Sequence, residues 1–224
     1  MADDVSAQGS SWSSPYELDP TSIQFKGGQL LGTIVKTISP DEKVKLPLTL
    51  SFLESGVARV TVDEEKRTNG DIELRHDSKA RKQRYNEAEK WAITGGLELS
   101  RSAILNTGTE AGVTKVLYGP ENGYQAVIHH APFDIQFQRD GETHVQFNNK
   151  GYLNMEHWRP KVDRPDDDPE KGKEDTWWEE SFGGNTDSKP RGPESVGLDI
   201  SFPGYSHVFG IPEHSDSLSL RETR

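Results

Sequence analysis

The 224-residue sequence contains no cysteine, which excludes disulfides, thiolate nucleophiles and cysteine-based zinc sites. It has no apolar run near the roughly 20 residues that a membrane-spanning helix needs. The first residues, MADDVSAQGSSW, lack the basic region and apolar stretch of a secretory signal, although a mature or truncated chain would look the same. Hydrophobic residues make up only 31%, while Gly (21) and Pro (13) are frequent. We therefore expect a packed core together with much polar loop.

Basic residues are also in short supply, with 26 Lys and Arg against 37 Asp and Glu, which leaves a net charge of −11. A field of this sign repels phosphate backbones and anionic headgroups. We therefore expect neither nucleic acid nor a membrane surface as a partner.

The common catalytic and cofactor motifs are missing. There is no Gly-x-Gly-x-x-Gly, no phosphate-binding Gly-x-x-x-x-Gly-Lys-Ser/Thr, no His-Glu-x-x-His and no Gly-x-Ser-x-Gly. The sequence therefore predicts no cofactor. Among 37 acidic residues, a spatial pair of carboxylates for glycoside hydrolysis stays open, because such a pair needs no local motif.

No metal site is predicted either. His129 and His130 are adjacent on a predicted strand, so their side chains point to opposite faces and do not readily share a metal. The pair Glu156-His157 is an equally weak candidate for metal binding. The run Asp166-Asp167-Asp168 lacks the ligand spacing and turn glycine of a calcium loop, so we interpret it as a solvated acidic stretch.

What the sequence does contain is a series of short strands separated by turns. Strands are predicted over 29–38, 46–53, 57–62, 114–118, 124–129, 133–138, 143–147, 195–202 and 207–211, with another near 91–93. Asp140-Gly141 predicts a two-residue hairpin turn. Phe133, Ile135 and Phe137 share one face with period two, which indicates a core face. With hardly any helical periodicity, this pattern predicts an all-β fold, an antiparallel β-sandwich.

Composition divides the chain into four parts. Residues 1–20 are predicted to be an extended tail or arm, whose Trp12 and Tyr16 either pin it to a partner or stay mobile. Residues 21–158 form the main part of the sandwich. Residues 159–176 are almost free of hydrophobics and predict an exposed acidic loop. Residues 177–224 hold the final strands. The charged stretch 63–90 is interpreted as a solvated connection.

The pair Trp177-Trp178 is the most tempting binding feature, since aromatic faces stack on sugar rings. Two tryptophans beside an acidic loop would form such a platform, which makes them weak candidates for substrate binding. The alternative is that one of them caps the core where the ordered chain resumes. We favour the packing interpretation.

Two stretches near the end of the chain carry a specific resemblance. DSKPRGPESVGLD (residues 187–199) is followed by HVFGIPEH (residues 207–214), after the WEESF that begins at Trp178. The pattern closely resembles the glucosidase II α-subunit family, which belongs to the family 31 glycoside hydrolases, and it covers most of residues 20–224. Residues 132–135 and 151–157 also look like this family.

The resemblance implies a galactose-mutarotase-like β-sandwich that precedes a (β/α)8 catalytic barrel absent from this chain. It implies an α-glucosidase of the endoplasmic reticulum lumen that trims α-1,3-linked glucose from N-linked glycans by a retaining mechanism, paired with a regulatory β subunit. The family's nucleophile motif, W-x-D-M-N-E, is missing here, so no catalytic residue is assigned to this chain. By this resemblance, the chain alone is expected to be inactive.

Three interpretations therefore stand. The chain is the non-catalytic sandwich that supports the barrel and the rim of its pocket, or a free-standing carbohydrate-binding module that uses Trp158, Trp177 and Trp178. Alternatively, it is a scaffold whose arm or acidic loop docks the β subunit. Because Arg224 is a residue after which trypsin-like proteases cut, we further expect the chain to be one piece of a nicked or split enzyme, bound to the remainder.

Overall fold

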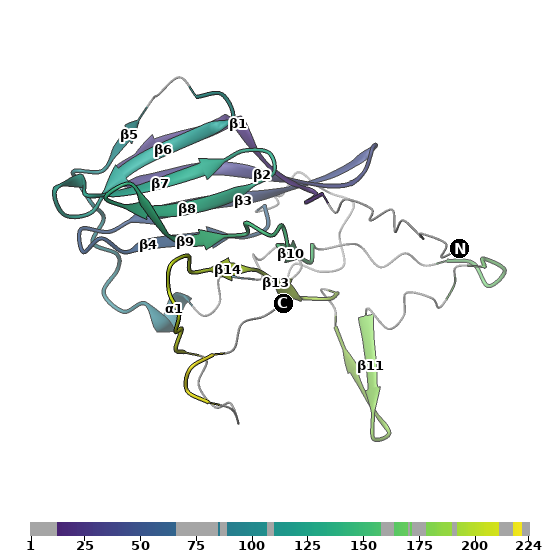
Figure 1. Ribbon diagram of the computed structural model, residues 1–224. Helices are drawn as coiled ribbons and strands as arrows, with labels where there is room; N and C mark the ends of the chain where they lie inside the picture. Colours follow the sequence, from purple (N-terminus) through teal and green to yellow (C-terminus); the bar gives the residue numbers. More distant parts are fainter. Residues whose placement is uncertain are drawn as a thin grey trace, which may run out of the picture.

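Two antiparallel β-sheets that face each other form most of the structure, which is a computed structural model (Figure 1). It describes residues 13–65, 85, 89–106, 110–157, 164–169, 171, 178–189, 192–210 and 217–220. The all-β, antiparallel sandwich predicted from the turn-separated strands is confirmed. Within these ranges, no helix is long and apolar enough to cross a membrane.

The first sheet is a meander with the strand order β1-β2-β3-β4. Its strands are β1 (Tyr16–Lys26), β2 (Gln29–Ser39), β3 (Glu42–Phe52) and β4 (Ala58–Val62). The predicted alternation is clear in β3, where Leu46, Leu48 and Leu50 are at most 1% exposed. Successive side chains of a strand point to opposite faces, so these leucines line the inner face together.

The second sheet has six strands in the order β14-β9-β8-β7-β6-β5. They are β5 (Ile104–Asn106), β6 (Val113–Tyr118), β7 (Tyr124–His129), β8 (Asp134–Arg139), β9 (Glu142–Phe147) and β14 (Ile200–Ser201). A 3-10 turn, η1 (Pro120–Asn122), joins β6 to β7. Asp140 and Gly141 connect β8 to β9 with φ values of 52° and 80°, as a two-residue hairpin turn requires.

Short elements lie outside the two sheets. The strand β10 (Asn154–Met155) pairs with β13 (Val196–Gly197), and β11 (Glu179–Phe182) pairs with β12 (Asn185–Ser188). One helical turn, α1 (Glu89–Ala92), replaces the strand expected near residues 91–93. That expectation is wrong because the residues just before Trp91 are Glu, Ala, Glu and Lys, which favour a helix and outweigh the β preference of Trp and Ile.

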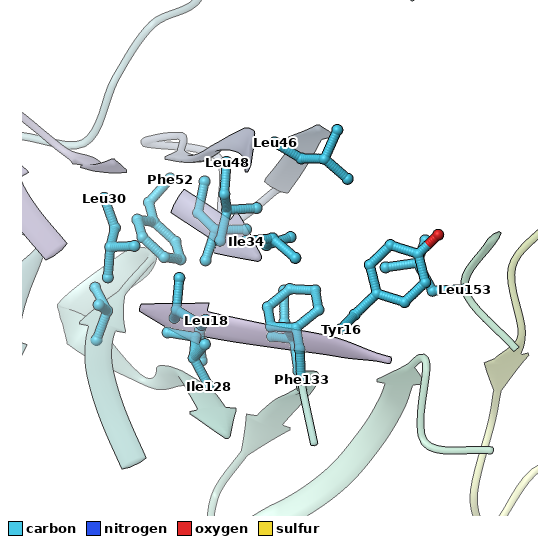
Figure 2. Close-up of a cluster of buried hydrophobic side chains, with 14 of the residues drawn as sticks. Tyr16, Leu18, Leu30, Ile34, Leu46, Leu48, Phe52, Ile128, Phe133 and Leu153 are labelled. Carbon is cyan, nitrogen blue, oxygen red and sulfur yellow. The ribbon is translucent and has the colours of Figure 1, made fainter. Parts of the chain in front are cut away.

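The core lies between the sheets and draws side chains from both (Figure 2). Its largest fully buried members are Tyr16, Phe52, Phe133, Leu18, Leu30, Ile34, Leu46, Leu48, Leu50, Ile128, Ile135 and Val116. The rings of Phe52 and Tyr118 meet across the interface at 4.8 Å between centroids. Phe133 and Ile135 are fully buried and Phe137 packs against the cluster, so the predicted core face is confirmed.

The strand β1 corrects the expectation that residues 1–20 form a tail or arm, because β1 begins at Tyr16. Tyr16 is 1% exposed. Its carbonyl accepts a hydrogen bond from the Phe133 amide (2.9 Å), and the Leu18 amide donates to the His130 carbonyl (2.8 Å). The start of β1 therefore joins the two sheets, which its polar composition concealed. Trp12 lies outside the described residues.

Two further predicted segments, 159–176 and 207–211, are only partly covered by the described residues. Of the predicted acidic loop 159–176, residues 164–169 and 171 are described, and there Arg164 forms an ion pair with Asp168 (3.3 Å). Of the predicted final strand 207–211, the described residues form one bridge, between Phe209 and Ser219. Most of the charged stretch 63–90 lies outside the described residues.

Candidate interaction surface

The last part of the chain exposes an unusual amount of apolar surface. Among the described residues, fourteen large hydrophobic side chains are classed as exposed, and seven of them fall between residues 196 and 218. These seven, named here the C-terminal apolar patch, are Val196, Leu198, Ile200, Phe202, Tyr205, Phe209 and Leu218. Single exposed hydrophobics are normal on protein surfaces, but three of these, Phe202, Tyr205 and Phe209, line one pocket, and contiguous apolar surface marks a contact site.

The segment is attached to the sandwich through β14, which extends the six-stranded sheet beside β9. Ile200 pairs with Phe147 and Ser201 pairs with Gln146. Just before β14, the Asp199 carbonyl accepts a hydrogen bond from the Asn148 amide (2.9 Å). The apolar patch is therefore paired to the edge of the six-stranded sheet at Ile200.

The Asp199 side chain secures the neighbouring loop. Its two carboxylate oxygens accept hydrogen bonds from the backbone amides of Lys150 (2.8 Å) and Tyr152 (2.9 Å). The loop is held from inside by Asn148, which is 2% exposed and bonds Phe133 and Leu153 through its side-chain amide. A carboxylate that bonds two amides of one loop fixes that loop relative to its own strand.

Beyond β14, a pocket of about 280 Å³ opens between β9 and the returning chain. It is lined by His144, Val145, Phe202, Tyr205, His207, Val208 and Phe209. Among the lining residues, the His144 Nδ1 and the Tyr205 hydroxyl lie 2.7 Å apart, within hydrogen-bond distance. The Leu220 amide donates to the carbonyl of Val208, another lining residue (2.8 Å). An apolar pocket with a few polar atoms at its rim can receive one large side chain of a partner.

The two tryptophans of the predicted sugar platform are placed differently. Trp178 is 6% exposed. Gly192 lies against its ring, and a Cβ at that position would come within 2.9 Å of the Trp178 Cζ3 atom. A ring covered in this way has no free face for a sugar, which favours the packing interpretation of Trp178. Trp158 and Trp177 lie outside the described residues.

The adjacent histidines His129 and His130 serve local hydrogen bonds. His129 Nδ1 lies 2.7 Å from Asp134 Oδ1, and His130 Nε2 lies 2.9 Å from Thr114 Oγ1. Burial, with a smaller effect of the neighbouring His129, lowers the pKa of His130. The part of the chain that the structure describes contains no cluster of three or more His, Asp or Glu side chains suited to a metal ion.

The acidic residues also show how carboxylates are used in this chain. The pKa values of Asp19, Glu110 and Glu180 are all lowered, mainly by hydrogen bonds from Thr21, Lys115 and Lys189 respectively. In the predicted acidic run, Asp166 pairs with Lys171. A general acid needs the opposite, a raised pKa that keeps its proton near neutral pH. These carboxylates are therefore suited to surface contacts rather than to proton transfer.

Sequence reasoning missed most of this surface. It predicted one strand over 195–202, where the structure has two short strands, β13 and β14, that pair with β10 and β9. It also gave no sign that the apolar side chains of this segment stay uncovered. His144, Tyr205 and the pocket between them come from segments that are 61 residues apart. No local sequence motif indicates that these two segments lie in contact.

The chain is similar to known proteins over nearly its whole length. A family profile described as the glycosyl hydrolase 31 N-terminal galactose mutarotase-like domain matches residues 47–224. Glucosidase 2 subunit alpha of Schizosaccharomyces pombe is 36% identical over 214 residues, which are 95% of this chain and 22% of the relative. Neutral alpha-glucosidase AB of Homo sapiens is 28% identical over 235 residues, covering 94% of this chain and 23% of the relative.

Solved structures agree with these relatives. A crystal structure of a glucosidase II alpha subunit bound to Glc1Man2 is 60% identical with a TM-score of 0.80, and covers 96% of this chain and 22% of that chain. A crystal structure of an ER glucosidase II heterodimeric complex, with the binding domain of a regulatory subunit, is also 60% identical, with a TM-score of 0.79. The chain therefore spans 22–23% of the length of these relatives.

Proposed function

Because the chain belongs to the glycosyl hydrolase 31 family, of which it carries the N-terminal galactose mutarotase-like domain, we propose that it is the non-catalytic β-sandwich of a glucosidase II-type α-glucosidase. In this proposal the domain supports the catalytic barrel and shapes the rim of the barrel's pocket. The observation that carries the proposal is the C-terminal apolar patch, which occupies the segment that leads from the paired edge of the sandwich. Apolar surface gathered there is stabilised when the following domain covers it.

The chemistry is assigned to the part of the enzyme outside these 224 residues. A retaining glycosidase needs a carboxylate nucleophile and a second carboxyl that acts first as acid and then as base, about 5–5.5 Å apart. The lowered pKa values of the exposed Asp19, Glu110 and Glu180 make these three groups unsuited to the acid role. We expect the chain alone to be inactive.

The proposed substrate is an N-linked glycan from which α-1,3-linked glucose is removed. Two solved relatives support it, since one is bound to Glc1Man2 and another to alpha3-Glc2. A relative from Arabidopsis thaliana is named a probable glucan 1,3-alpha-glucosidase and is 28% identical over 187 residues. The contacts that this domain makes with the sugar remain part of the proposal.

The proposed location is the lumen of the endoplasmic reticulum, with a regulatory β subunit as partner. The heterodimer solved for the 60% identical ER enzyme supports both statements. The alternative of a free-standing carbohydrate-binding module is weakened by the burial of Trp178, one of its three candidate aromatics.

The test is to produce the whole enzyme that carries this domain and to measure glucose release from an α-1,3-linked glucose disaccharide. In a second preparation, residues 1–224 and the remainder are expressed as two polypeptides. We expect activity from the whole enzyme and from the co-expressed pair, and none from residues 1–224 alone. Activity of the remainder without this chain, at the level of the whole enzyme, would contradict the supporting role.

A further inference from the structure

The hairpin formed by β11 and β12 has an unusual position in the fold. Its strands are paired only with each other, from Glu179 and Ser188 at the base to Phe182 and Asn185 at the tip. Every residue of both strands is exposed. Figure 1 shows the hairpin extending away from the two sheets, on the side where β13 and β14 lie.

Such a hairpin has little to stabilise it by itself. A two-stranded ribbon with no third strand and no apolar face is marginal in water. Neither face of the hairpin is apolar. One face carries Ser181 and Thr186, whose hydroxyl oxygens lie 3.2 Å apart, and the other carries carboxylates beside one aromatic ring. The hairpin therefore gains stability only if something packs on it.

The single apolar side chain of that second face is Phe182. It is 85% exposed, more than any other large hydrophobic residue among those the structure describes. It stands next to the turn residues Gly183 and Gly184, at the tip. Glu180 and Asp187, which form a cross-strand pair, lie on the same face of the hairpin as Phe182. Lys189 already pairs with Glu180 (2.8 Å), so the feature left for a partner is the protruding aromatic ring, which fits an apolar pocket.

The base of the hairpin is held by contacts within residues 178–192, unlike its tip. Trp178 is buried, and its carbonyl accepts a hydrogen bond from the Lys189 amide at 2.6 Å. The Gly192 amide donates to the Lys189 carbonyl (2.9 Å). An arm with an anchored base presents Phe182 at a defined place, which lowers the entropy lost when it docks.

We propose that the β11–β12 hairpin is a docking arm whose Phe182 inserts into the part of the same enzyme that lies outside residues 1–224. This inference rests on the proposed function and deepens it by naming a second contact, separate from the C-terminal apolar patch. Two features favour the same polypeptide as the occupant. The chain spans only 22% of the solved relative, and the arm extends on the side of β13 and β14, where the apolar patch begins.

The test is cysteine labelling in the whole enzyme, measured by mass spectrometry on the peptide that carries the introduced thiol. Asn185→Cys places a thiol opposite Phe182 on the docking face, and Thr186→Cys places the matched control thiol on the other face. Rates in urea give the intrinsic reactivity of each position. After division by the rates in urea, we expect Cys at 185 to react at least about tenfold more slowly than Cys at 186. The reason is that the docked face is shielded from the reagent and the other face is not. Adding Phe182→Ser to Asn185→Cys should remove the protection.

Three results would overturn the inference. Position 185 reacts as fast as position 186, or Phe182→Ser leaves the protection unchanged, or protection appears only when the regulatory subunit is added. A third thiol, Phe209→Cys, separates this inference from the proposed function. If position 209 is shielded while position 185 is accessible to the reagent, the apolar patch packs as proposed and only the proposal for the docking arm is wrong. If position 209 is open in the active enzyme, the proposed packing itself is wrong.

Discussion

The backbone amide of Met155 donates a hydrogen bond of 2.9 Å to the hydroxyl of Tyr16, which lies 139 residues earlier in the chain. Both residues are buried, so this bond joins the first strand of the sandwich to the segment that pairs with β13. Lys36 supports the same place, because its ammonium donates to the Met155 carbonyl (2.9 Å) and lies 5.6 Å from the centre of the Tyr16 ring.

The substitution Tyr16→Phe tests that bond. It keeps the buried ring but leaves the Met155 amide without its acceptor, which we expect to lower the free energy of unfolding by about 1–3 kcal/mol. Urea denaturation of the 224-residue chain measures the change. Tyr152→Phe is the matched control, since Tyr152 is 60% exposed and should change stability little. Equal effects of the two substitutions would show that the bond contributes nothing specific.

The contact between Gly192 and Trp178 makes a second prediction. Gly192 has φ 71°, and a Cβ there would clash with the indole ring. Gly192→Ala should therefore displace Trp178 towards water, shift tryptophan emission to longer wavelength and destabilise the fold by about 1–3 kcal/mol beyond the backbone strain. Gly183→Ala is the control, because Gly183 has φ 56° with nothing within 4 Å of its Cβ. An emission shift of the same size in the control would contradict the packing role.

Alkaline pH should weaken the fold through Tyr118. Burial, and to a lesser extent Tyr124, raises the pKa of Tyr118 to about 12, from an ordinary value of 10.0. The folded state therefore favours the neutral phenol, so the contribution to stability is complete below pH 10 and is lost as the pH rises towards 12. Because one pKa unit corresponds to about 1.4 kcal/mol, the loss is about 2–3 kcal/mol.

Urea unfolding at several pH values between 9 and about 12 checks this prediction. Tyr118→Phe should flatten the decline in stability over this range. Part of the decline should persist, because burial also raises the pKa of Tyr16. A decline as steep in Tyr118→Phe as in the unchanged chain would exclude Tyr118 as its source.

The contact between His144 and Tyr205 joins β9 to the returning chain at the pocket, and a double-mutant cycle measures it. We expect His144→Ala and Tyr205→Phe to be coupled by about 0.5–1 kcal/mol in the free energy of unfolding, the range of a hydrogen bond at an accessible site. His144→Ala with Tyr152→Phe is the control pair and should be additive. Additivity in both pairs would show that the contact does not secure the segment.

Much of the fold could be predicted from local pattern. The alternation of Leu46, Leu48 and Leu50 and the turn at Asp140-Gly141 need only the strand period and the positive φ of a two-residue turn. The motifs around residues 187–214 indicated the family, which the relatives confirm. The division into four parts beyond these elements stays a prediction.

Other features depended on contacts between distant segments. Residues 16–20 look like a polar arm, yet Tyr16 and Leu18 are core residues because the opposite sheet supplies carbonyl and amide partners at residues 130 and 133. For Trp178 the sequence left a sugar platform open beside the favoured packing interpretation, and the contact with Gly192 supports packing. In both cases the burial of the side chain is set by a neighbour that sequence spacing does not reveal.

By itself, then, the sequence determined the strand alternation, the hairpin turns and the family, because these depend on backbone geometry and on contiguous motifs. Only the tertiary structure decided which apolar faces become core and which stay open. The side chains of Ile34 and Ile200 have the same chemistry, but Ile34 is fully buried and Ile200 is 50% exposed. The difference arises because Ile34 packs in the core between the two sheets, whereas Ile200 is outside that cluster of buried side chains.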